Sequence, residues 1–248
     1  MEARTWAARQ QLFRAYFEQV AADIVCIQEA SADSFEDDFG FMRELGYDHE
    51  LHRKFRFRSA TFWRRDKFQL QATAHKDRTL INALQGCDGD SGEALYVVNC
   101  HLSGGSQPER RFGQVHQALD QVRKEVVKSS KAGGNKGAAG CGPDFSSVPV
   151  VVCGDFNSEA AEGGGTAWQA LLRDGELEAN FRELLYPDTK ITSKRKAQVF
   201  GRFTDVYAAA FKERSEKAPR TYIAAPLDGK FLENGFEERR AGGGAHPQ

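Results

Sequence analysis

The sequence predicts an α/β fold in which strands alternate with helices. Short runs of β-branched and aromatic residues recur along the chain, and several are separated by segments whose apolar residues have helical spacing. The 248 residues are 40% hydrophobic, which is enough to build a sizeable core. Alternating strands and helices form layers because each helix buries its apolar stripe against a sheet.

Each predicted element rests on a local pattern. Apolar residues from Trp6 to Val20 follow a helical stripe, and a second helix over residues 35–45 ends before Gly46, a residue that favours helix ends. A long amphipathic segment predicts a helix over residues 111–127. Further helices are predicted over residues 166–173 and 202–211. Strands are predicted at residues 24–28, 59–63, 68–73, 79–84, 95–102 and 148–153.

The remaining segments are rich in glycine and small residues. We expect a flexible loop at about residues 131–146 and a low-complexity tail over residues 226–248. Residues 1–225 are then expected to form one domain.

Composition excludes several classes of protein. The formal net charge is −1, so the whole surface is not a basic field, and no apolar run approaches the roughly 20 residues of a membrane span. The five cysteines form no C-x-x-C pair, and three of them, Cys26, Cys100 and Cys153, lie inside apolar runs. This pattern is typical of a reduced protein, so we expect an intracellular location, cytoplasmic or nuclear.

Three of the predicted strands end in polar residues that can carry chemistry. Glu29 closes the first strand, His101 lies near the end of another, and Asp155 and Asn157 follow Gly154 after the last. A carboxylate at a strand end can hold Mg²⁺, which keeps water and phosphate oxygens as its other ligands. Histidine and asparagine can donate hydrogen bonds to a phosphate as its charge develops. Together these residues predict phosphoester hydrolysis.

The segments around these residues resemble the signature blocks of the endonuclease/exonuclease/phosphatase superfamily. The blocks are residues 23–30 (DIVCIQEA), residues 98–102 (VNCHL) with Gln114 downstream, and residues 152–158 (VCGDFNS), in the family's order. Residues 59–63 (SATFW), ahead of Lys67, are closest to the deadenylase and nocturnin-like branch.

The resemblance implies a fold and a set of roles. The family fold is a four-layer α/β sandwich of two facing mixed sheets flanked by helices. Glu29 would be the ligand of Mg²⁺, with Mn²⁺ as a possible substitute. His101 would face the phosphate, Asp155 would orient the nucleophile, and Asn157 would contact the phosphate. The expected activity is that of a nuclease acting on RNA or on a nucleotide substrate.

The chain departs from the family pattern at both ends. A first strand with a metal-site asparagine precedes the first helix in the family, and a catalytic Asp-His pair ends the domain; the sequence contains neither in those places. The early pair Asp48-His49 is interpreted as a surface feature. We therefore expect an incomplete domain, and two alternatives stay open. One is an inactive fragment or pseudoenzyme that binds nucleic acid or a protein, and the other is an inositol or nucleotide phosphatase.

Two clusters of arginine are candidates for substrate binding. Arg56 and Arg58 alternate with aromatic residues in a basic segment, which would suit phosphates and stacked bases, or simply a solvated basic strand. Arg110 and Arg111 follow His101, where they would reach a phosphate or begin a helix.

Overall fold

The computed structural model describes residues 5–87, 94–132, 143–158, 171, 199–200, 202–206 and 209. The chain forms two compact units, one comprising Met1–Val20 with Thr204–Gln248 and the other comprising Ala21–Phe203. Helix α1 (Trp6–Val20) belongs to the first unit and confirms the predicted opening helix. Its aromatic rings lie along one side, with the Phe13 centroid 6.2 Å from those of both Trp6 and Phe17.

The second unit begins with a three-stranded antiparallel sheet in the order β1-β3-β2. The strands are β1 (Ile24–Ser31), β2 (Tyr47–Leu51) and β3 (Phe57–Arg64). Two short helices, α2 (Phe35–Phe39) and α3 (Phe41–Glu44), cover its outer face. The packing is aromatic, because the ring of Phe62 on β3 lies 5.9 Å from that of Phe35 and 6.0 Å from that of Phe39.

A four-stranded sheet in the order β4-β5-β6-β7 forms the other half of this unit. Its strands are β4 (Phe68–Lys76), β5 (Thr79–Gly86), β6 (Leu95–His101) and β7 (Val150–Asp155). Only β6 and β7 are parallel, and the connection between them contains helix α4 (Pro108–Ala132), as a parallel crossover requires. The buried face of α4 packs on the outer side of this sheet, with Phe112 and Leu119 in one core with Val98.

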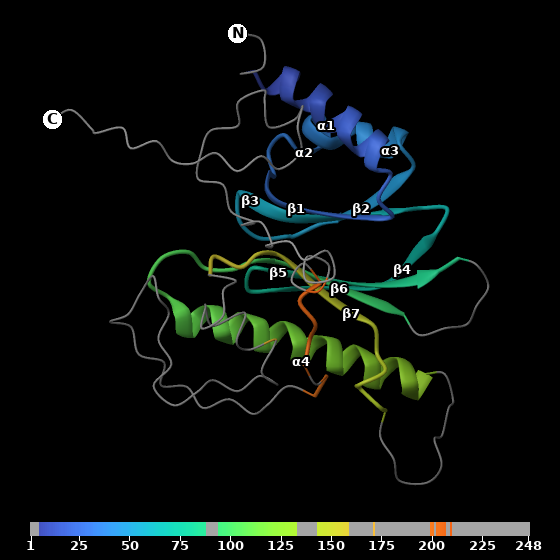
Figure 1. Cartoon of the computed structure of the whole chain (residues 1–248), viewed down its shortest axis with the longest axis vertical. Helices are drawn as coiled ribbons and strands as arrows, with labels where there is room; N and C mark the ends of the chain where they lie inside the picture. The colour runs from blue at the N-terminus through green and yellow to red at the C-terminus, as the bar shows by residue number, and fades with distance from the viewer. Residues whose placement is uncertain are drawn as a thin grey trace, which may run out of the picture. The chain divides into compact units, whose positions relative to one another are not determined.

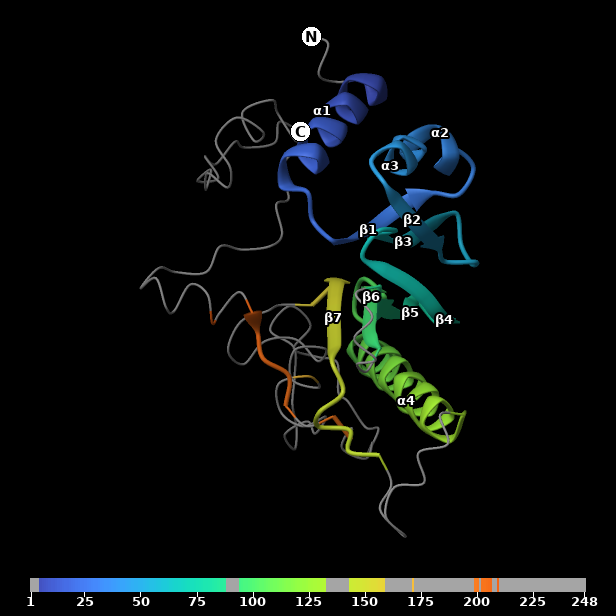
Figure 2. The ribbon, with the colours of Figure 1, turned by 90° about the vertical axis from the view of Figure 1, so that its right-hand side faces the viewer.

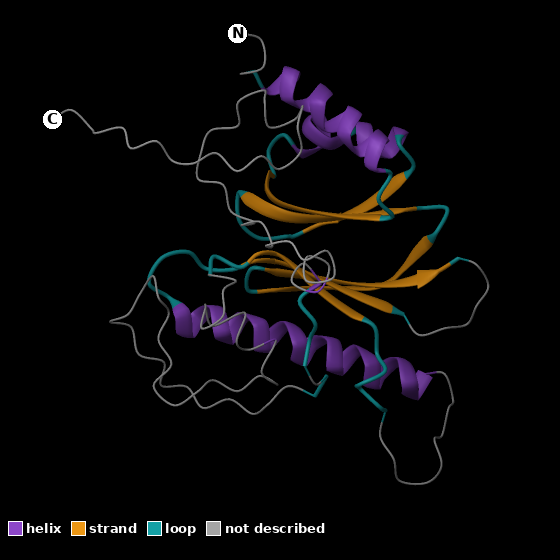
Figure 3. Cartoon of the chain, viewed as in Figure 1, coloured by secondary structure: helices purple, strands orange, loops and turns teal. Residues whose placement is uncertain are grey.

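The two sheets face each other, with α2 and α3 on one outer side and α4 on the other (Figures 1, 2 and 3). Trp63 of β3, Leu84 of β5 and Val97 of β6 form a buried apolar cluster between them. This arrangement confirms the predicted α/β class with two sheets. Within the described residues, no helix combines the length and apolar character needed to cross a membrane.

The structure differs from the sequence-based expectations in two places. The single helix predicted over residues 35–45 is divided into α2 and α3 at Gly40. Strand β2 was not predicted, because its central residues Asp48, His49 and Glu50 are polar and β2 is an edge strand. The tail over residues 226–248 lies outside the described residues, as does most of the loop at 131–146 and most of the helices expected at 166–173 and 202–211.

Candidate active site

Three strands from the two sheets bring their ends together at one place. His101 on β6 is the register partner of Asp155 on β7, and its Nε2 atom lies 4.0 Å from Asp155 Oδ2. The same nitrogen lies 3.6 Å from Oε1 of Glu29, which β1 contributes from the opposite sheet. The sequence analysis proposed these three residues as one set, and the structure places the carboxylates of Glu29 and Asp155 near the imidazole of His101.

Glu29 occupies an irregular position in β1. The pairing of β1 with β3 shifts register between Ile27 and Ala30, and Glu29 has a φ of +60°. This left-handed conformation is costly for a residue other than glycine and is found preferentially at functional sites. The Glu29 side chain is 69% exposed, so its carboxylate is open to solvent and solutes.

Next to Glu29 in β1, a hydrogen bond between two polar side chains connects the two sheets. Gln28 Nε2 donates a 2.9 Å hydrogen bond to Oδ1 of Asn99, which is fully buried on β6. Asn99 Nδ2 in turn donates to the backbone carbonyl of Ala60 on β3 at 2.9 Å. Sequence reasoning gave Asn99 no role of its own. The signal was its polar side chain inside an apolar strand, two residues before His101.

The turn after β7 is shaped by close backbone contacts. Gly154 has a φ of +122°, and a Cβ atom built there would lie 2.1 Å from the carbonyl oxygen of Cys100, so no other residue fits. The backbone N–H of Asn157 donates to Asp155 Oδ1 at 2.8 Å, and its side-chain Nδ2 donates to the carbonyl of Leu102 at 2.8 Å. These bonds fix the Asp155 carboxylate and tie the ends of β6 and β7 together.

The two arginines predicted after His101 differ in their surroundings. Arg111 is fully buried, and its Nη1 donates to the carbonyls of Ser103 at 2.8 Å and Gly105 at 2.7 Å. Its prediction as a substrate contact is corrected, because a guanidinium buried in the protein and bonded to carbonyls is out of reach of a phosphate. Arg110 is exposed and forms an ion pair of 3.2 Å with Asp77.

Arg56 and Arg58 lie where β3 begins, beside the end of β1. Arg58 is the register partner of Ala30, the neighbour of Glu29, and its Nε donates to the carbonyl of Phe55. Arg56 is exposed, lies 3.3 Å from Asp33, and stacks over the ring of Phe57. The backbone of these two arginines therefore lies beside the end of β1, and their side chains contact Phe55, Asp33 and Phe57.

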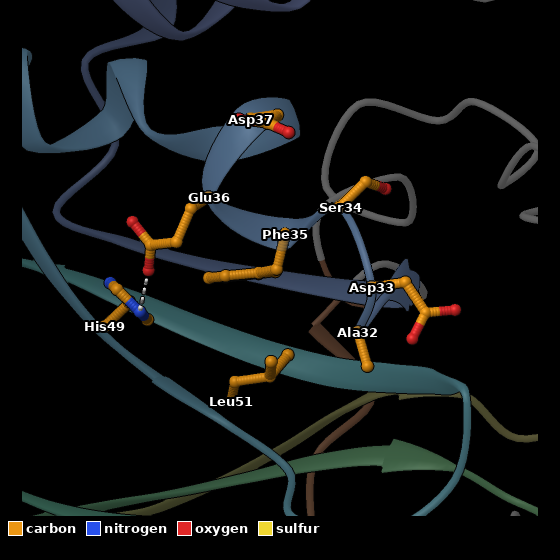
Figure 4. A pocket seen from close by; sticks show the side chains of 8 residues that line it. All are labelled: Ala32, Asp33, Ser34, Phe35, Glu36, Asp37, His49 and Leu51. Atoms are coloured by element: carbon orange, nitrogen blue, oxygen red, sulfur yellow. Dashed lines mark ion pairs between the residues drawn. The ribbon is translucent and has the colours of Figure 1, made fainter.

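A shallow hollow of about 260 Å³ lies on the other side of β1 and does not include the three site residues. Figure 4 shows its lining, in which Glu36 of α2 faces His49 of β2 at 3.9 Å. The ring of His49 also packs at a tilt against that of Phe35, with 5.0 Å between the ring centroids. His49 is thus part of the packing under α2, while the Asp48 side chain is exposed near Arg65, and neither belongs to the group around His101.

The donor set at the strand ends fits a hard divalent cation. The described residues contain no group of three or more histidine, cysteine, aspartate or glutamate side chains arranged to hold a metal by themselves. Mg²⁺ needs fewer protein ligands, because it binds through one or two carboxylates and keeps waters and substrate phosphates. The exposed carboxylate of Glu29 matches this requirement.

A comparison with protein families is consistent with the residues found at these strand ends. Residues 1–215 match the endonuclease/exonuclease/phosphatase family. The chain belongs to this family.

Curated members of the family show distant similarity. The chain is 21% identical over 220 residues to the CCR4-Not complex 3′-5′-exoribonuclease subunit Ccr4 of Kluyveromyces lactis, an alignment of 73% of this chain and 26% of that protein. The Ccr4 subunit of Schizosaccharomyces pombe is 22% identical over 231 residues, with 75% of this chain and 33% of that protein aligned. The chain therefore spans about a quarter to a third of these relatives.

Solved structures of family members show the same fold. The structure of ANGEL2, a 2′,3′-cyclic phosphatase, in complex with adenosine-2′,3′-vanadate has a TM-score of 0.58 and 19% identity, covering 79% of this chain and 56% of that one. The human Nocturnin catalytic domain with bound sulfate has a TM-score of 0.50 and 21% identity, covering 67% of this chain and 62% of that one.

Proposed function

We propose that this family member is a divalent-metal-dependent phosphoesterase that hydrolyses phosphodiester bonds in RNA or in a nucleotide substrate. The observation that carries the proposal is the meeting of Glu29 and Asp155 at Nε2 of His101, from strands of two different sheets. Two carboxylates and an imidazole at one exposed edge are the groups that metal-assisted attack of water on a phosphate needs.

In this proposal each residue has one task. Asp155 orients the attacking water, and its Oδ1 is already fixed by the backbone N–H of Asn157. His101 donates from Nε2 to a phosphate oxygen as negative charge builds up during bond breaking. The amide of Asn157 uses one of its two N–H donors on Leu102, so the second is available to the phosphate.

Glu29 is the residue proposed to hold Mg²⁺, with Mn²⁺ as a substitute. A cation bound there would polarise the phosphate and compensate its charge. The position suits this role because the Glu29 carboxylate is exposed, while the bulge of β1 fixes the backbone that carries it.

The proposed substrate class rests on the relatives and on the charges around the site. The backbone of Arg56 and Arg58 lies beside the end of β1, the strand that carries Glu29, and Arg110 lies on α4, after His101. Cations in these places would bind the backbone phosphates of a nucleic acid. The similarity to 3′-5′-exoribonuclease subunits supports RNA as substrate. An intracellular location, cytoplasmic or nuclear, is part of the proposal.

A phosphatase is the second candidate function. The observation that favours it is the structural similarity to ANGEL2, whose description is that of a 2′,3′-cyclic phosphatase. The two candidates differ in their products, since a nuclease releases nucleotides from RNA and a cyclic phosphatase only opens or removes a terminal phosphate.

The test is hydrolysis of a panel of substrates with and without Mg²⁺. The panel contains poly(A) RNA, RNA ending in a 2′,3′-cyclic phosphate, duplex DNA with abasic sites, a dinucleotide phosphate and an inositol phosphate. Wild-type protein is compared with Asp155→Asn and Glu29→Gln. Asp48→Asn is the matched control, because Asp48 is an exposed carboxylate opposite Trp63, at the far end of the sheet from Glu29.

We expect Mg²⁺-dependent shortening of poly(A) RNA that both site variants lose and the control retains. Phosphate release from the cyclic end without shortening would support the phosphatase instead. No turnover on any substrate by folded wild-type protein would overturn the proposal in favour of an inactive relative, and RNA binding to that protein would then be measured.

A further inference from the structure

Two cysteines face each other between the sheets, directly below the strand ends. Side chains two residues apart on a strand point to the same face. Cys26 therefore shares the inner face of β1 with Gln28, and it packs against the apolar cluster of Trp63, Leu84 and Val97. On β7, Cys153 is the register partner of Asn99, whose side chain also lies between the sheets.

The thiols of these two cysteines interact. Hydrogen bonding between them raises the pKa of Cys26, which burial raises further, and lowers the pKa of Cys153. Neither residue is fully buried. Strands β1 and β7, although far apart in sequence, also lie close to each other in space.

The other two cysteines of the described residues lack this arrangement. Cys100 is fully buried and faces α4, in one core with Val98 and Leu102. Cys87 is exposed just beyond the end of β5, and its sulfur lies 4.0 Å from the carbonyl of Arg65.

We propose that Cys26 and Cys153 are an oxidative modification site, at which a peroxide converts the two thiols into a disulfide that joins the two sheets. The Cys153 thiolate attacks one peroxide oxygen, so an S–O bond forms and the O–O bond breaks with loss of hydroxide. Cys26 then attacks the sulfur of the resulting sulfenic acid, and the S–O bond breaks as the S–S bond forms. With hydrogen peroxide, the two thiols lose two electrons and two molecules of water are released.

The location gives this crosslink a direct effect on the strand ends. Cys26 lies three residues before Glu29, and Cys153 lies two residues before Asp155. A disulfide would therefore connect the strand that carries one carboxylate to the strand that carries the other. The proposal does not depend on the proposed activity, because the disulfide itself is measured.

The experiment treats the full-length chain with hydrogen peroxide and maps disulfides by mass spectrometry of peptides prepared without reductant. Free thiols are counted in denaturant before and after treatment. The variants Cys26→Ala and Cys153→Ala are compared with Cys87→Ala, which removes an exposed thiol outside the pair.

We expect a linked peptide joining Cys26 to Cys153 and a loss of two of the five thiols in the wild type. Reductant restores both thiols, and Cys87→Ala still forms the link. Cys26→Ala should instead trap a sulfenic or more oxidised Cys153, and Cys153→Ala should leave Cys26 as a free thiol. Three results would each overturn the proposal: disulfides formed only through Cys87 between chains, a link to Cys100, or retention of the Cys26 and Cys153 thiols at peroxide concentrations that oxidise Cys87. The wild-type peptide map gives this answer even where a variant does not fold.

Discussion

The side-chain amide of Asn157 donates a hydrogen bond of 2.8 Å to the backbone carbonyl of Leu102. The bond joins the segment that follows β7 to the end of β6, and so connects the residues next to Asp155 and His101. Asn157 makes this contact from a left-handed backbone with a φ of +46°. Asparagine adopts this conformation more readily than most residues other than glycine.

Replacing Asn157 by alanine should lower the free energy of unfolding by about 1 to 2 kcal/mol, because the hydrogen bond is lost and alanine is strained at positive φ. Asn157→Gly separates the two effects, since glycine accepts the backbone conformation but makes no side-chain bond. Urea denaturation should show a smaller loss for Gly than for Ala. Equal losses would contradict a contribution from the backbone conformation.

Gly154→Ala should destabilise the protein by about 3 kcal/mol or more, because the added Cβ would overlap the backbone of Cys100 and the φ of +122° is strained for alanine. Gly86→Ala is the control, since nothing lies within 4 Å of a Cβ built there. Thermal denaturation of the two variants measures the difference. A Gly154→Ala protein as stable as Gly86→Ala would show that β6 and β7 are less closely paired than described.

Adjacent arginines should respond very differently to substitution. Arg111→Met leaves the carbonyl of buried Ser103 without its guanidinium donor and removes one of the two donors to the carbonyl of Gly105, and we expect a loss of at least about 2 kcal/mol. Arg110→Met removes an exposed ion pair with Asp77, which is worth less than about 1 kcal/mol. Denaturant unfolding of both variants tests this order. A larger loss for Arg110→Met than for Arg111→Met would contradict the burial of the Arg111 side chain.

The stability of the protein should fall as the pH is lowered from about 6.5 towards 4, in part because of His75. Burial, followed by the charges of Arg53 and His52, lowers the pKa of His75 to about 4, although the Glu50 carboxylate lies 3.2 Å from its Nε2. The unfolded chain takes up a proton on His75 in this range and the folded protein does not, so acid favours unfolding.

His75→Gln should therefore reduce the pH dependence of the denaturation midpoint between pH 7 and pH 4. His116→Gln, on the helix α4, serves as the control. If both variants kept the wild-type slope, His75 would not be the group responsible.

The sequence predicted the strands that carry the site but not the contacts that assemble it. Glu29, His101 and Asp155 could be selected because each follows a run of apolar residues that had to form a buried strand. Their meeting depends on how two sheets stack, and local patterns carry no information on stacking. The family resemblance supplied that information.

The sequence also did not predict which individual polar residues are buried. Arg110 and Arg111 are identical in type and adjacent in sequence, yet one is exposed and the other fully buried. A helix turns by about 100° per residue, so neighbours face different surroundings, and only the packing of α4 on its sheet decides which side is covered. Strand β2 was missed for a related reason, since an edge strand tolerates polar residues.

The division of the site between two sheets has a consequence for how the protein responds to heat. Glu29 moves with one sheet, while His101 and Asp155 move with the other. A slide of one sheet across the other would separate these groups without melting a single strand, and the Gln28–Asn99 hydrogen bond is a restraint against that motion. The proposed phosphoesterase activity is therefore expected to fade on warming before the strands unfold, and the interval between the two temperatures would measure how firmly the two sheets are held together.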